Sequence, residues 1–178
     1  MVEDKGKPWK NSRFAFEKVS ERGIAMESEN SLALEFMREY ADDVTELAKF
    51  IPYFMSKSSG DYSKNYDGKY GESSLNFPVY DSTLLSFVKK ASQTKLMDRN
   101  YPYVYTRYHI KTHEDERNFI SKATIRDVKI LKGFLSKYVI EGNRIAKRWS
   151  EGADEGIYLG VLEKLKGFID FYSLGTRA

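Results

Sequence analysis

The chain contains no cysteine, and this absence excludes several kinds of chemistry. Disulfide bonds, thiolate nucleophiles and cysteine-ligated zinc or iron–sulfur centres all require that side chain. No apolar run approaches the ~20 residues that cross a bilayer. The basic residues between Met1 and Lys10 are not followed by the apolar segment of a secretory signal. We therefore predict a soluble, cytoplasmic protein that does not enter a membrane.

Motifs for catalysis and cofactor binding are also scarce. The only histidines are His109 and His113, and Ile110 stands where a metalloprotease helix needs a glutamate. No glycine cluster follows a strand and opens a helix, as a phosphate-binding loop requires. The sequence therefore predicts no metal site, no cofactor and no catalytic residue. An enzyme of unidentified chemistry stays open as an alternative, because the histidines and distant carboxylates can meet in a pocket.

What the chain does contain is enough apolar surface for one domain. Its 178 residues are 41% hydrophobic and 15% aromatic, which is typical of a chain that buries a core. The 13 tyrosines and 11 phenylalanines are many for this length. Tyrosine combines a large apolar ring with a hydroxyl, so the surplus suits a hydrated core boundary or an interaction surface. We predict a single domain over residues 1–178.

Charge is unevenly distributed although the formal net charge is only +3. Residues 27–55 hold seven acidic side chains against Arg38 and Lys49, whereas residues 121–150 hold eight basic side chains against Asp127 and Glu141. Two such regions can attract each other inside the fold, or each can face a partner. The balanced total favours the internal arrangement.

Helical periodicity dominates the chain and predicts a mainly α bundle. Ser31 is a suitable N-cap for a helix that ends near Pro52. Asp81 or Ser82 is a suitable N-cap for a second helix. Residues 124–172 form the expected helical core, with a helix from Thr124, a break at Glu141-Gly142, a short helix and a closing helix. The apolar stripe of the closing helix is Ile157, Val161, Leu162, Leu165, Phe168, Ile169 and Tyr172.

Two segments depart from this helical pattern. Residues 1–29 have weak periodicity and are interpreted as an N-terminal arm. The segment from Tyr101 to Ile110 alternates β-branched and aromatic residues, which predicts an extended strand. A strand needs a partner, and the arm supplies the candidate. The predicted fold is therefore a single-domain helical bundle with one short two-stranded β element.

Residues 56–77 form an unusual stretch rich in serine, glycine and tyrosine. They contain six serines and three glycines, and Tyr62, Tyr66 and Tyr70 recur every four residues. A long loop without secondary structure inside a compact domain is commonly functional or mobile. Serine, glycine and tyrosine together are typical of adaptable recognition loops. The segment is thus predicted to be a long loop whose three tyrosines contact a protein partner.

The C-terminal part of the chain carries a pattern of a helix, a Glu-Gly turn, a short helix and a closing helix. Its residues are Glu141-Gly142, Ala146, Trp149, Glu151-Gly152, Ile157, Val161-Leu162 and Leu165. Over roughly Tyr101 to Phe168 this pattern resembles a family of bacterial and phage helical domains whose function is unassigned. Charged residues and an aromatic commonly precede the Glu-Gly in the family, whereas this chain has Tyr138, Val139 and Ile140. The resemblance implies a mainly α fold and a bacterial or mobile-element setting, and no activity.

These patterns favour a non-catalytic binding module that acts on a protein partner, such as a phage or mobile-element inhibitor or adaptor. A nucleic-acid-binding protein is the alternative, because residues 121–150 have the outline of a helix–turn–helix and tyrosines at 101–105 could stack on bases. The residues that would contact nucleic acid are Arg107, Lys129, Arg144, Lys147 and Arg148.

Overall fold

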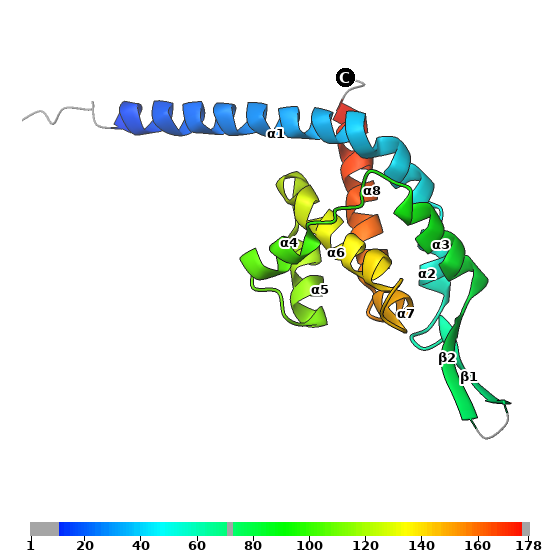
Figure 1. Cartoon of the computed structure of the whole chain (residues 1–178). Helices are drawn as coiled ribbons and strands as arrows, with labels where there is room; N and C mark the ends of the chain where they lie inside the picture. Colours follow the sequence, from blue (N-terminus) through cyan, green and yellow to red (C-terminus); the bar gives the residue numbers. More distant parts are fainter. Residues whose placement is uncertain (1–10, 71–72, 176–178) are drawn as a thin grey trace, which may run out of the picture.

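The computed structural model describes the backbone of residues 11–70 and 73–175, and the side chains of residues 28–66 and 77–174. Over these residues the fold is mainly α with one two-stranded antiparallel sheet, as predicted. Helix α8 runs through the bundle and contacts α1, α2, α5, α6 and α7 (Figure 1). The elements are α1 (Asn11–Ala48), α2 (Ile51–Ser56), β1 (Ser63–Tyr70), β2 (Ser73–Tyr80), α3 (Ser82–Ser92), α4 (Tyr101–Arg107), α5 (His113–Lys122), a 3-10 turn η1 (Ile125–Asp127), α6 (Val128–Glu141), α7 (Arg148–Asp154) and α8 (Ile157–Gly175).

Helix α1 is longer than its sequence pattern predicted. It begins at Asn11 and passes through Ser31, so the prediction that Ser31 caps a new helix was wrong. The predicted arm is therefore helical over its described part, and residues 1–10 lie outside the described backbone. The first half of α1 projects beyond the bundle, while the second half packs against α8 (Figure 1).

The end of α1 follows the sequence closely. The helix stops at Ala48, and α2 begins at Ile51 with Pro52 in its first turn, where the missing proline N–H costs nothing. Helix α1 directs apolar side chains toward the core, where Val44 and Leu47 are fully buried. This part of the helix therefore has one buried side and one exposed side, as helical periodicity predicts.

The predicted two-stranded element exists, but at another place in the chain. Strands β1 and β2 pair antiparallel from Ser63↔Tyr80 to Tyr70↔Ser73, so most of residues 56–77 belongs to a hairpin rather than to a loop. The alternation of β2 is hidden in the sequence by its serines, an asparagine and Pro78. Pairing satisfies the backbone polar groups that the two strands direct at each other, which a structureless loop would leave to water.

The segment predicted to be extended, Tyr101 to Ile110, begins as helix α4. Asn100 precedes the helix and Pro102 stands in its first turn, a favourable position for proline. Tyr101 and Val104 are buried three residues apart, which is helical spacing. The strand prediction was wrong because burial on one side of a single helical turn outweighed a weak β propensity.

Helix α5 and the turn η1 begin where their capping residues indicate. Thr112 caps α5 through a capping box with Asp115, and Thr124 does the same for η1 with Asp127. Along α8, all seven predicted stripe residues lie in the core or pack against it. Ile145 lies before α7, which begins at Arg148, and is 44% exposed. No helix of the described chain is long and apolar enough to span a membrane.

Candidate protein-binding site

The hairpin is anchored to the bundle at its base. The Tyr62 side chain is buried and donates its hydroxyl hydrogen to the carbonyl oxygen of Phe54, at 3.1 Å. The N–H of Asp81 donates to the carbonyl oxygen of Tyr62 at 3.0 Å, so the two ends of the hairpin meet. Asp81 also caps α3 by accepting from the N–H of Thr83 at 2.9 Å. One residue thus ends the sheet and begins a helix.

Charge reinforces this anchor. Lys57 Nζ lies 2.8 Å from one oxygen of Asp81, and the Tyr53 hydroxyl donates to the other at 2.8 Å. The Lys57 hydrogen bond, together with those from Tyr53 and the α3 backbone, lowers the pKa of Asp81 to about 2, although partial burial acts in the opposite direction. The base of the hairpin therefore holds a carboxylate that stays ionised at any physiological pH.

One face of the hairpin points toward the bundle. Ser63 and Tyr80 are opposite each other in the register. The Ser63 hydroxyl lies 3.1 Å from Ser150 Oγ, and the Tyr80 hydroxyl accepts from the N–H of Lys147 at 2.8 Å. The Tyr80 ring also packs on Trp149, with centroids 5.2 Å apart. Because side chains alternate along a strand, the neighbouring positions of β1 and β2 point away from the bundle.

The opposite face of the hairpin carries exposed apolar side chains over its described part. Tyr66 and Phe77 are cross-strand partners, and their rings stack with centroids 5.0 Å apart and planes at 30°. Val79 lies two residues further on the same face, opposite Lys64. Tyr66, Phe77 and Val79 are 50%, 47% and 47% exposed. We call these three residues the hairpin face; on a two-stranded sheet that projects from the bundle (Figure 1) they form an accessible apolar surface.

The three predicted partner-binding tyrosines lie in different environments. Tyr66 belongs to the hairpin face, but Tyr62 is only 2% exposed and belongs to the core. Tyr70 pairs with Ser73 at the tip of the hairpin, and its side chain lies outside the described residues. Sequence reasoning missed Phe77 and Val79 as site residues. Their spacing of two was the available signal, and Pro78 between them obscured it.

The residues proposed for nucleic-acid binding are spread over several elements, and carboxylates lie among them. Arg148 is paired with Glu141 and Glu151, at 2.9 and 2.7 Å. Arg107 is exposed on α4 and donates to the Tyr103 hydroxyl at 2.7 Å. The remaining three, Lys129, Arg144 and Lys147, are exposed on α6 and on the α6–α7 connection. With Glu151 and Asp154 on the seven-residue α7, the second helix of the predicted helix–turn–helix carries both signs of charge.

The acidic and basic regions of the sequence meet inside the fold. Glu35 and Glu39 of α1 line a hollow of about 300 Å³ together with Lys129 and Lys132 of α6. Lys132 donates to the Tyr40 hydroxyl at 2.8 Å and lies over its ring. Burial lowers the pKa of Lys132, while the nearby charge of Glu39 opposes this shift. Part of the basic segment therefore lies beside the protein's own carboxylates.

The two histidines do not share a site. His109 is exposed in the α4–α5 connection, with a left-handed φ of 54°. His113 opens α5, and its Nδ1 and Nε2 lie 3.2 Å from Glu116 and 3.1 Å from Glu151. Among the described side chains no group of three or more histidines and carboxylates is arranged to hold a metal ion.

A buried polar cluster surrounds the carboxylate of Glu116, which is fully buried. One oxygen accepts from the Tyr105 hydroxyl and lies 3.2 Å from Lys137 Nζ; the other accepts from Tyr138 at 2.6 Å and lies 3.2 Å from His113 Nδ1. Burial alone would raise the pKa of Glu116, but these hydrogen bonds and the Lys137 charge together lower it. We call these five residues the Glu116 cluster. Since its donors and acceptors satisfy one another, it ties α4, α5 and α6 together as a structural element.

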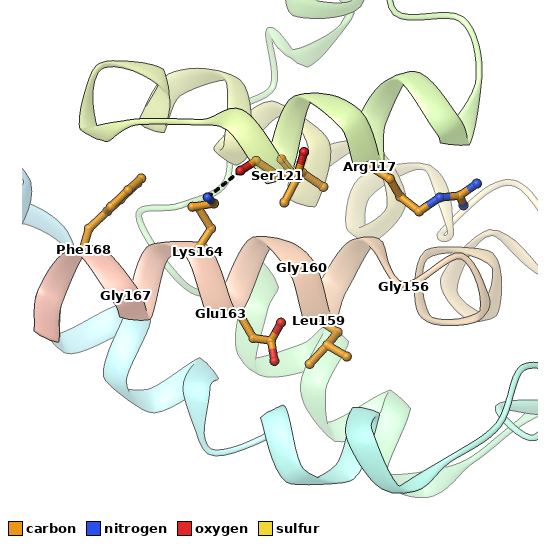
Figure 2. Close-up of a pocket in the computed structure, with 10 residues that line it drawn as sticks. Arg117, Ser121, Gly156, Leu159, Gly160, Glu163, Lys164, Gly167 and Phe168 are labelled. Carbon is orange, nitrogen blue, oxygen red and sulfur yellow. Dashed lines mark hydrogen bonds between the residues drawn. The ribbon is translucent and has the colours of Figure 1, made fainter. Parts of the chain in front are cut away.

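A cavity of about 680 Å³ lies between α5 and α8 (Figure 2). Its floor runs along glycines of α8 and of the turn before it. Gly156 has a φ of +70°, which the turn into α8 requires, and a Cβ at Gly160 would stand 3.2 Å from Ile120 Cγ2. Two of the three glycines are thus explained by the backbone and by the close packing of α5 on α8.

The two cationic residues that line this cavity are engaged with the protein itself. Lys164 Nζ donates to the carbonyl oxygen of Ser121 at 2.9 Å (Figure 2). Arg117 forms an ion pair with Glu155 at 2.6 Å. The cavity therefore offers an apolar floor with few polar groups directed into it. The hairpin face is the stronger candidate because it is apolar, projecting and unexplained by packing.

Comparison with known proteins identifies no relative of this chain. No protein-family model, no curated protein and no solved structure matches it.

Proposed function

We propose that the protein is a non-catalytic binding module that holds a protein partner on the hairpin face. The observation that carries the proposal is the exposed, stacked Tyr66–Phe77 pair on a hairpin that projects from the bundle. Exposing aromatic rings to water is unfavourable, so a partner that covers them gains binding free energy. In a bacterial or phage setting, such a module would act as an inhibitor or adaptor of a host protein.

The surroundings of the hairpin face support a protein as the ligand. A hollow of about 360 Å³ at the hairpin base is lined by Val79 and by the charged residues Lys57, Asp61, Lys64 and Asp81. An apolar centre bordered by polar groups is the usual composition of a protein interface. Aromatic residues near the centre of such an interface commonly dominate the binding free energy.

The test compares the full chain with the double substitution Tyr66→Ser and Phe77→Ser. Proteins captured by the wild-type chain from a bacterial lysate are identified by mass spectrometry, and the affinity of the purified partner is measured by calorimetry. The matched control is Phe171→Ser with Leu174→Ser, which removes two apolar side chains that are 68% and 72% exposed on α8. We expect the hairpin variant to weaken binding by about tenfold or more and the control to leave it unchanged. Equal binding by wild type and hairpin variant would refute the proposal.

A further inference from the structure

The hydrogen-bond pattern of the hairpin can be assigned from its register. In an antiparallel pair, residues that exchange both backbone hydrogen bonds alternate with residues whose N–H and C=O groups point outward. Asp81 donates to the carbonyl oxygen of Tyr62 at 3.0 Å, and Tyr62 lies opposite Asp81 when the register is continued by one pair. The even-numbered residues of β1 therefore bond to β2, and its odd-numbered residues point their backbone groups outward.

This alternation places Pro78 at an outward-pointing position of β2. Pro78 lies opposite Asn65, an odd-numbered residue. Its missing N–H therefore costs the hairpin no internal hydrogen bond, but it removes a donor from the outer edge of β2. Proline at this position is a recognised way to block the edge of a sheet.

The outer edge of β1 has no such interruption. The backbone N–H and C=O groups of Asn65, Asp67 and Lys69 point outward from it, and within the described chain the sheet contains no strand besides β1 and β2. An edge of this kind is a template for a further strand. The two edges of one hairpin thus differ: β2 is blocked at Pro78, and β1 is open.

We infer that the partner adds an extended segment to the β1 edge as a third strand, and this inference rests on the proposed function of the hairpin face. Main-chain hydrogen bonds to Asn65, Asp67 and Lys69 would supply affinity, and alternate side chains of the segment would extend the hairpin face beside Tyr66. The exposed ammonium of Lys64 lies on that same face. The segment therefore alternates apolar and polar residues and carries a carboxylate next to Lys64.

The probe is a displayed library of random linear peptides of roughly ten residues, a length that covers one strand, panned against the full chain. The enriched peptides are synthesised, and their affinities are measured by fluorescence anisotropy. We expect apolar residues at every second position and at least one acidic residue. Enrichment of helical spacing, or no enrichment, would overturn the inference.

Asn65→Pro tests the edge directly, because it removes one outward N–H from β1 just as Pro78 does on β2. We expect it to weaken peptide binding about tenfold or more, whereas the matched variant Pro78→Ser leaves binding unchanged. Retained exchange protection of the Lys64 and Tyr66 amides verifies that the hairpin still forms. Unchanged peptide binding by Asn65→Pro would overturn the inference.

Amide hydrogen exchange of the wild-type chain gives a second test that needs no substitution. Bound peptide should slow exchange at Asn65, Asp67 and Lys69, and protection at Ser74 and Asn76 of β2 instead would contradict the inference. The outcomes also separate the two proposals. If Tyr66→Ser with Phe77→Ser abolishes partner binding and Asn65→Pro does not, the hairpin face stands and strand addition falls. If neither substitution affects the partner, both fall.

Discussion

The Glu116 cluster and the hairpin face both depend on tyrosine, but they use opposite ends of its side chain. Tyr105 and Tyr138 direct their hydroxyls at a buried carboxylate, and burial together with the Glu116 charge raises the pKa of each. Tyr66 instead presents its ring to solvent beside Phe77. The many tyrosines therefore contribute both to a polar core and to an apolar surface in one molecule. Substitutions in the two regions should change the free energy of unfolding by different amounts.

The largest expected effect is at the centre of the cluster. Glu116→Ala leaves the Lys137 ammonium and the Tyr105 and Tyr138 hydroxyls without their buried acceptor, so we expect the free energy of unfolding to fall by about 3–5 kcal/mol. Urea titration followed by circular dichroism measures it. Glu114→Ala, an exposed site on the same helix, should change it by less than about 1 kcal/mol. Similar losses in both variants would contradict a central role for Glu116.

Gly152 and Gly167 differ in the space that is available for an added Cβ. A Cβ at Gly152 would meet Tyr158 Cζ at 2.7 Å and Tyr138 Cγ at 2.8 Å, whereas a Cβ at Gly167 would meet nothing within 4 Å. Gly152→Ala therefore displaces the ring that bonds Glu116 and should cost about 1–3 kcal/mol. Gly167→Ala should stabilise α8 by about 0.5–1 kcal/mol. Thermal unfolding of both variants checks the opposite signs.

Acid should weaken both the Glu116 cluster and the base of the hairpin. Both Glu116 and Asp81 have lowered pKa values in the folded protein, so each stabilises it fully above its unfolded pKa and ceases to do so as pH falls through the folded value. The Glu116 contribution should be lost below about pH 4.5. The Asp81 contribution, about 1 kcal/mol after solvent screening, should be lost between about pH 4 and 2. Urea titrations across this range should show Lys57→Met reducing the Asp81 loss and leaving the Glu116 loss in place, because the Lys57 hydrogen bond is the largest cause of the lowered Asp81 pKa.

The smallest expected effect is on the hairpin face itself. Tyr66→Ser removes a solvent-exposed cross-strand contact, so the free energy of unfolding should change by less than about 1 kcal/mol. Tyr62→Ser, four residues earlier, removes a buried ring and should cost about 3–5 kcal/mol. Equal costs at the two positions, measured by urea titration, would mean that the hairpin face is part of the folded core.

Helices with long stripes and clear caps were predictable from the sequence. The closing helix, the caps at Thr112 and Thr124 and the stop near Pro52 all follow from local chemistry. The strand prediction at Tyr101 was wrong because two buried side chains decided the conformation of a short segment. The hairpin was missed because serines, glycine and proline interrupt its alternation, although pairing between strands tolerates them.

The candidate site was predictable only in part. Tyr66 was named from composition, but the same spacing also named Tyr62, which the core requires. Nothing local distinguishes these two tyrosines. Tyr62 precedes β1 and packs on Tyr53 and Phe54 of α2, whereas Tyr66 lies within the hairpin, and only the tertiary structure decides which ring is covered. The Glu116 cluster lay beyond sequence reasoning, because Glu116 and Tyr138 come from separate helices and meet through tertiary packing.

The hairpin leaves and rejoins the helical bundle at a single point, where Asp81 donates to the carbonyl oxygen of Tyr62 at 3.0 Å. Because the chain ends already meet there, residues 64–79 can be excised and replaced by a short turn, while Ser63 and Tyr80 keep their contacts with Ser150 and Trp149. The same junction would accept a transplanted hairpin of another sequence. The sequence of the hairpin could therefore change independently of the helices that hold it.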